Sequence, residues 1–108
     1  MIEKVTEDGK VAVIIHAEYG GGWSSCIRWS HTQSLLYNPT IVAILTSGAA
    51  NAESQIKAYM ETNFPEVIAY SYRNLSVVWI PVGTKFRVLE YDGWESIELF
   101  DDVEWLTA

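Results

Sequence analysis

The periodicity of the apolar residues in this 108-residue chain changes at Pro65. Before it, between Asn38 and Phe64, apolar side chains recur at the spacing of about 3.6 residues that gathers them on one face of a helix. After it, the spacing falls to two residues, which is typical of strands. Helices that precede a run of strands predict an α+β fold, with the helices packed on one sheet.

The length fits a single domain, residues 1–108, that is large enough to bury a core. Hydrophobic residues make up 49 % of the chain. That fraction is well above the level at which chains fail to collapse, so order is expected almost throughout. Only residues 1–8 are expected to be loose.

Residues 10–18 (KVAVIIHAE) are apolar on both alternating faces, which predicts a central strand covered on each side. The glycines at 20–22 then predict a sharp turn. Ser24 or Ser25 can cap a helix over residues 26–36.

A better helix start lies at Asn38, because asparagine caps free amides and the following proline tolerates the first helical position. Gly48 is expected to end this helix, and Asn51 to open the next, which Pro65 stops. The apolar residues of the two helices at helical spacing are Ile41, Ile44, Leu45, Ile56, Tyr59, Met60 and Phe64.

Four strands are expected in the antiparallel meander that follows, at residues 67–72, 75–80, 85–91 and 94–100. The strongest hairpin signal is Asp92-Gly93. A two-residue loop there pairs Tyr91 with Trp94. The other pairs of this register are Glu90 with Glu95, Leu89 with Ser96, Val88 with Ile97, Arg87 with Glu98, and Phe86 with Leu99.

This register gives the hairpin two different faces. Its core face carries Phe86, Val88, Ile97 and Leu99, with Glu90 and Glu95 at the tip of that face. Its outer face carries Leu89, the aromatic pair Tyr91 and Trp94, and an ion pair of Arg87 with Glu98.

The last nineteen residues account for the whole formal charge of −7, because residues 1–89 hold as many bases as acids. The segment has no lysine or arginine, and its acids are Glu90, Asp92, Glu95, Glu98, Asp101, Asp102 and Glu104. Aromatic residues are threaded through it, so it is interpreted as folded acidic surface and not as a disordered tail. The charge opposes direct binding of nucleic acid and favours a basic protein partner.

The register places Glu90 opposite Glu95, and like charges at that spacing are destabilising. A solvated hairpin tip is the favoured explanation. A paired-carboxylate acid/base site, a divalent ion and a basic partner side chain stay open. The residues expected to bind a partner are Glu90, Tyr91, Asp92, Trp94 and Glu95.

The glycine-rich turn is a second candidate site, because a turn between a strand and a helix can aim backbone amides at a phosphate. Its candidate residues are Gly20, Gly21, Gly22, Trp23, Ser24, Ser25 and Arg28. Neither a Walker loop nor a G-x-G-x-x-G motif is present, so a plain turn is favoured. Trp23 is also expected near the surface, available to a partner.

The sequence assigns no catalytic residue, metal or cofactor. His16, Cys26 and His31 could form a cysteine nucleophile site, but their spacing does not require one. A single cysteine and no secretory leader predict a reducing, cytosolic setting. No apolar run approaches the roughly 20 residues that span a bilayer, so no membrane association is expected.

Two stretches carry a resemblance, residues 81–97 (PVGTKFRVLEYDGWESI) and 102–108 (DVEWLTA), and the turn at residues 20–24 is similar too. Together they cover about half of the chain. They resemble small proteins encoded by tailed bacteriophages and some large viruses. This family is uncharacterised, so the resemblance implies a phage-encoded protein of the host cytoplasm and no activity.

The sequence therefore predicts a phage accessory protein that acts by binding. Its acidic, aromatic hairpin would engage a basic surface of a host protein, as a nucleic-acid mimic would. One alternative is binding or processing of a small-molecule or phosphate-containing ligand at the glycine-rich turn, residues 19–25. Another is a structural domain that self-associates through Trp105 and Leu106.

Overall fold

The computed structural model describes residues 3–17, 23, 34–65, 72, 74–91 and 94–99. Its elements are β1 (Thr6–Glu7), β2 (Lys10–His16), α2 (Pro39–Thr46), α3 (Ala52–Asn63), β3 (Leu75–Pro81), β4 (Phe86–Tyr91) and β5 (Trp94–Leu99). The strands form two antiparallel sheets, one in the order β1-β2-β3 and one of β4 with β5. The predicted α+β class is confirmed. The meander is divided, because β3 pairs with β2 and not with β4.

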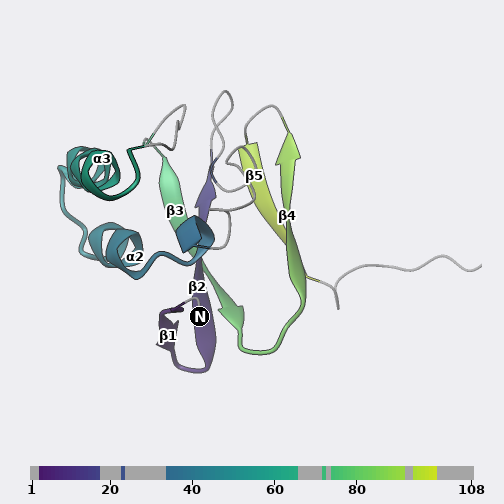
Figure 1. Cartoon of the computed structure of the whole chain (residues 1–108). Coiled ribbons are helices and arrows are strands. Elements are labelled where there is room, and N and C mark those ends of the chain that lie inside the picture. The colour runs from purple at the N-terminus through teal and green to yellow at the C-terminus, as the bar shows by residue number, and fades with distance from the viewer. Residues whose placement is uncertain are drawn as a thin grey trace, which may run out of the picture.

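The chain is arranged in three layers (Figure 1). Helices α2 and α3 lie on one side of strands β2 and β3, and the hairpin β4–β5 lies on the other. Successive side chains of a strand point to opposite faces, so an apolar run such as β2 serves both neighbours. The predicted central strand covered on each side is confirmed.

Two clusters of apolar side chains fill the spaces between the layers. The helix-side cluster consists of Ala12, Ile14, Trp23, Leu35, Ile41, Val42, Ile56, Met60 and Leu75. The hairpin-side cluster consists of Val13, Ile15, Leu36 and Ile80, with the partly buried Tyr37, Val78, Phe86, Val88, Ile97 and Leu99 packed against it. In β2, Ala12 and Ile14 belong to the first cluster, and Val13 and Ile15 belong to the second.

The N-terminal residues correct one expectation. Thr6 and Glu7 form β1, which pairs with β2 in the register Thr6 to Val11. The turn between them is Asp8-Gly9, and both residues have positive φ, 52° and 74°. That conformation suits a two-residue hairpin loop. Residues 5–8 are therefore held by the sheet, and the prediction that they are loose is wrong.

The ends of α2 lie where the sequence places them. The side chain of Asn38 caps the helix, since its Oδ1 accepts a hydrogen bond from the amide of Ile41 at 3.0 Å. Pro39 occupies the first turn, where its missing N–H costs nothing. Just beyond the last residue, Gly48 has φ of 74°, a conformation that favours glycine.

Helix α3 also follows its prediction. It begins after Asn51 and ends two residues before Pro65. Ile56 and Met60 are buried, while Tyr59 and Phe64 are half-buried against the helix-side cluster. Of the remaining expected elements, the helix at residues 26–36 is described only at its last turn, 34–36, and the strand at 67–72 lies outside the described residues except for Tyr72.

Candidate functional site

The hairpin β4–β5 carries most of the predicted partner-binding residues, and its register is the predicted one. Phe86 pairs with Leu99, Arg87 with Glu98, and so on to Tyr91 with Trp94. Asp92 and Gly93 fill the two-residue gap between the strands and lie outside the described residues. Because the register is correct, so is the assignment of residues to the two faces of the hairpin.

Three large apolar side chains on the outer face are exposed. The exposed fractions are 37 % for Leu89, 75 % for Tyr91 and 42 % for Trp94. Tyr91 and Trp94 are direct cross-strand partners at the tip. The aromatic residues of the predicted partner surface, Tyr91 and Trp94, are therefore accessible to another molecule.

At the other end of the same face, the predicted ion pair is confirmed. Nε of Arg87 lies 2.7 Å from Oε1 of Glu98, and Nη2 of Arg87 contacts the same oxygen. The Arg87 side chain is exposed and that of Glu98 partly exposed, so water screens the pair and it contributes little to stability. It does neutralise one of the carboxylates that the charge count assigned to the acidic surface.

Glu95 is not where the sequence prediction placed it. Its side chain is completely buried. Oε1 accepts a hydrogen bond from the amide of His16 at 3.0 Å, and Oε2 accepts one from the amide of Trp23 at 2.9 Å. The prediction of a solvated tip is therefore wrong for Glu95. Hydrogen bonds from buried N–H groups compensate a carboxylate for its loss of hydration, so it can be buried.

This arrangement also relieves the repulsion expected across the hairpin. Glu90 faces Glu95 in the register, yet Glu90 is exposed while the carboxylate of Glu95 is directed to the end of β2 and to Trp23. The two charges thus occupy different environments. Of the three carboxylates on the described strands of the hairpin, only Glu90 is exposed.

Trp23 is the one described residue of the glycine-rich turn, and it is completely buried. Its Nε1 donates a hydrogen bond to the carbonyl oxygen of Leu35 at 3.1 Å. Its ring meets that of Tyr72 edge-on, with the centroids 6.4 Å apart. The expectation that Trp23 lies at the surface to contact a partner is therefore wrong. The other candidates, Gly20, Gly21, Gly22, Ser24, Ser25 and Arg28, lie outside the described residues.

The candidate nucleophile site is described at one position only. His16 is buried as the last residue of β2, whereas Cys26 and His31 lie outside the described residues. Within the described ranges, no three His, Cys, Asp or Glu side chains are grouped as a metal site would require. Asp101, Asp102 and Glu104 also lie outside the described residues.

A search of the described helices for a membrane span finds none that is long and apolar enough. No family model, curated protein or solved structure matches the chain.

One feature was missed at the level of sequence. An open cavity lies on the hairpin side of β2 and β3, and its lining includes Lys4, Tyr37 and Phe86. These residues come from separate parts of the chain with no common motif. No local pattern could have brought them together.

Proposed function

We propose that the protein acts by binding another protein through the outer face of the hairpin β4–β5. The observation that carries this proposal is the exposure of Leu89, Tyr91 and Trp94 on one strand pair. Aromatic residues supply much of the binding energy at protein interfaces, because they bury a large area at a small cost in side-chain entropy.

The charge of the chain supports a basic partner. A net charge of −7 attracts a positively charged protein from a distance and raises the rate of encounter. Glu90, on the opposite face of the hairpin from Tyr91, is exposed and contributes to this charge. Because the sequence resembles proteins of tailed bacteriophages, the partner that we propose is a host protein of the bacterial cytoplasm.

The acidic part of this surface is smaller than the charge count suggests. Glu95 is buried and Glu98 is paired with Arg87. On the described strands the outer face is therefore mainly apolar and aromatic, and its charged residues are the paired Arg87 and Glu98. We infer that the aromatic side chains supply affinity, while charge steers association.

The test is capture from a bacterial lysate by the purified protein and by the double variant Tyr91→Ser, Trp94→Ser. The double variant should lose the specific partner, since removal of two interface aromatics weakens binding by at least about tenfold. The matched control is Val82→Ser, because Val82 is 61 % exposed but lies outside the hairpin. Its capture should equal that of the unaltered protein, and added salt should slow association.

Two outcomes would contradict the proposal. In one, the double variant still captures the same protein, or the control loses it equally. In the other, ultracentrifugation shows a dimer of the purified protein that the double variant abolishes, which would assign this face to self-association.

A further inference from the structure

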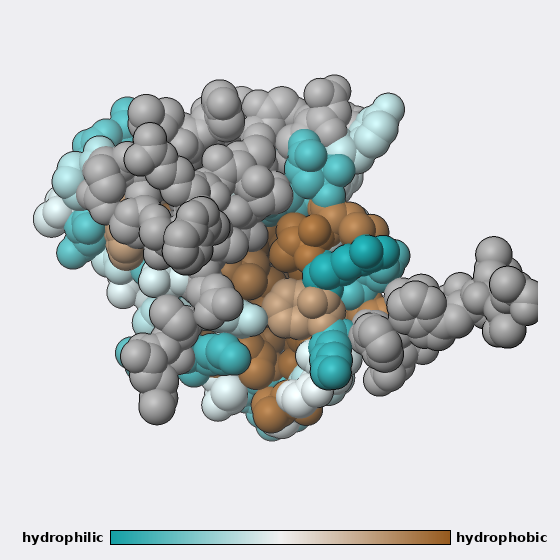
Figure 2. Space-filling view, turned by 45° about the vertical axis from the view of Figure 1, so that its right-hand side comes forward, coloured by the Kyte–Doolittle hydropathy of each residue, from teal (hydrophilic) through white to brown (hydrophobic). Residues whose placement is uncertain are grey.

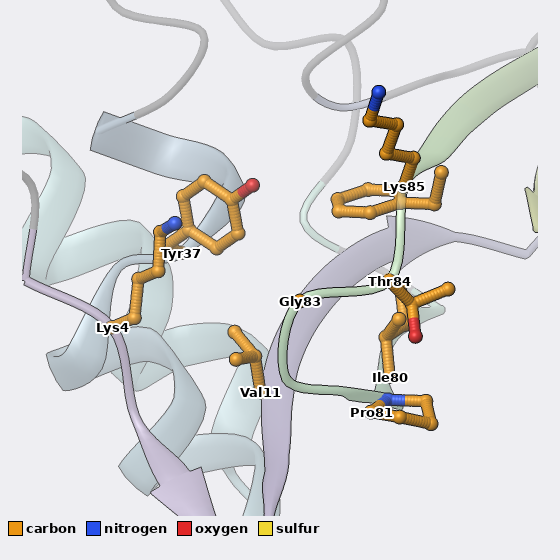
Figure 3. Close-up of a pocket in the computed structure, with 9 residues that line it drawn as sticks. Lys4, Val11, Tyr37, Ile80, Pro81, Gly83, Thr84 and Lys85 are labelled. Atoms are coloured by element: carbon orange, nitrogen blue, oxygen red, sulfur yellow. The ribbon is translucent and has the colours of Figure 1, made fainter.

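A cavity of about 500 Å³ opens on the hairpin side of the central sheet, away from the outer face of the hairpin. Val11 of β2 and Ile80 of β3 contribute to its lining, as do Tyr37, before α2, and Phe86, at the start of β4. Figure 3 shows Tyr37 on one side of the opening and Ile80, Pro81 and Thr84 on the other. The volume lies within the range of small-molecule sites.

The lining is mainly apolar. Val11, Ile80, Pro81 and Phe86 present hydrocarbon, and Tyr37 adds an aromatic ring. Apolar side chains are open to solvent in a hollow on the face that the hairpin side presents (Figure 2). A ligand with an apolar body would gain free energy by covering this surface, at roughly 25 cal/mol per Å² removed from water.

The charged residues of the lining are both lysines, Lys4 and Lys85, although acids outnumber bases two to one in the chain. The amino group of Lys4 lies 4.8 Å from the centre of the Tyr37 ring. In Figure 3 the amino group of Lys85 points away from the cavity, so Lys4 is the cation available to a ligand.

Tyr37 adds a hydrogen-bond donor to the lining. Burial raises the pKa of the Tyr37 phenol, so the hydroxyl keeps its proton at neutral pH. An ammonium group and a neutral phenol in the same lining can both donate to a carboxylate.

We propose that this cavity binds a small aromatic monocarboxylate. Its ring would lie against Val11, Ile80 and Phe86, and its carboxylate would be held by Lys4 and the hydroxyl of Tyr37. The cavity and the outer face of the hairpin share no residue, so this inference does not depend on the proposed function.

The test is a titration followed by amide NMR spectra, with three probes. Naphthoate has the ring and the charge, naphthamide has the ring alone, and inorganic phosphate has the charge alone. We expect naphthoate to shift the amides of Val11, Ile80 and Thr84 saturably. Naphthamide and phosphate should each bind at least about fivefold more weakly than naphthoate. Naphthamide lacks the charge contact, which is partly exposed, and phosphate lacks the apolar contact.

Substitutions then identify the cation. Lys4→Gln should weaken naphthoate binding about fivefold, whereas Lys4→Arg should largely preserve it. Lys57→Gln is the matched control, because Lys57 is an exposed lysine on α3, on the other side of the sheet. It should leave binding unchanged. Tyr37→Phe keeps the ring and should weaken binding about threefold.

Three results would overturn the inference. If naphthamide bound as tightly as naphthoate, the carboxylate would not contribute to binding. If Lys57→Gln weakened naphthoate binding as much as Lys4→Gln, the effect would be a non-specific attraction of the anion to positive charge. Shifts confined to Tyr91 and Trp94 would place the probe on the hairpin instead. Shifts of the cavity amides with protein concentration alone would assign the cavity to a second copy of the chain.

Discussion

The two sides of the central sheet are covered to different degrees. Among the described residues, nine form the buried cluster beneath α2 and α3 on the helix side. On the hairpin side four of the described residues form the buried cluster, and the apolar side chains that β4 and β5 pack against it stay partly exposed. A pair of helices closes one face of the sheet, whereas a two-stranded hairpin leaves part of the other open. The side that packs less completely is the side that carries both candidate binding surfaces.

A polar contact compensates for this incomplete cover. Glu95 belongs to β5, yet its carboxylate accepts hydrogen bonds from His16, at the end of β2, and from Trp23, a member of the helix-side cluster. Hydrogen bonds to a charged acceptor are stronger than neutral ones. The hairpin is thus attached by apolar contacts along its length and by one buried carboxylate near its tip.

The largest expected effect comes from removing that carboxylate. Glu95→Ala leaves the amides of His16 and Trp23 without this acceptor, and each buried unsatisfied donor costs about 1–3 kcal/mol. We expect the free energy of unfolding, measured in urea, to fall by about 4 kcal/mol. Glu95→Gln retains one acceptor oxygen and should lie between this variant and the unaltered protein.

Glu90→Ala is the matched control, because Glu90 is the cross-strand partner of Glu95 and is exposed. It should change the free energy of unfolding by no more than about 0.5 kcal/mol. If Glu95→Ala were as mild as this control, the hairpin would not depend on the buried carboxylate.

A pair of identical substitutions compares the two sides directly. Ile56 is completely buried on α3, and Ile97 is half-buried on β5. Ile56→Ala should lower the free energy of unfolding by about 3 kcal/mol, which includes the cavity left behind. Ile97→Ala should cost about 1–2 kcal/mol, since less area is lost from contact. Equal losses in urea unfolding would show that the hairpin side is packed as well as the helix side.

The smallest effect concerns alkaline pH. Burial raises the pKa of Tyr37, on the hairpin side, above its ordinary value of 10.0. On the helix side, burial and then the negative charge of Glu61 raise the pKa of Tyr72. Unfolded tyrosines lose their protons first as the pH passes about 10, so stability should decline from there upward.

Tyr37→Phe and Tyr72→Phe should each flatten this decline, because phenylalanine does not ionise. The measurement is the free energy of unfolding at about pH 8 and about pH 10.5 for each variant. A decline of unchanged slope in either variant would show that the corresponding side of the sheet tolerates a charged phenol.

Much of the local structure follows from the sequence. The Asn38 cap, the stops near Gly48 and Pro65, and the pairing of β4 with β5 all lie where they were predicted. Each of these features is decided by residues close together in the chain. A register in particular is determined once the turn and one apolar face are known.

Glu95 and Trp23 show where such reasoning stops. Glu95 has the same local pattern as Glu90, and nothing nearby in sequence marks one as buried and the other as exposed. The difference comes from the amides of His16 and Trp23, which lie 79 and 72 residues away in the chain. Strand β1 is a different case, because the Asp8-Gly9 turn that pairs it with β2 is itself a local hairpin signal.

The sequence by itself determined the α+β class, the ends of the helices and the two faces of the hairpin, because periodicity, caps and turns act over a few residues. The tertiary structure alone decided which carboxylate leaves water, how completely each side of the sheet is covered, and that Lys4, Tyr37 and Phe86 share a cavity. These outcomes depend on contacts between segments that are distant in the chain. The packing of the layers decides which side chains are buried and which hydrogen bonds they make.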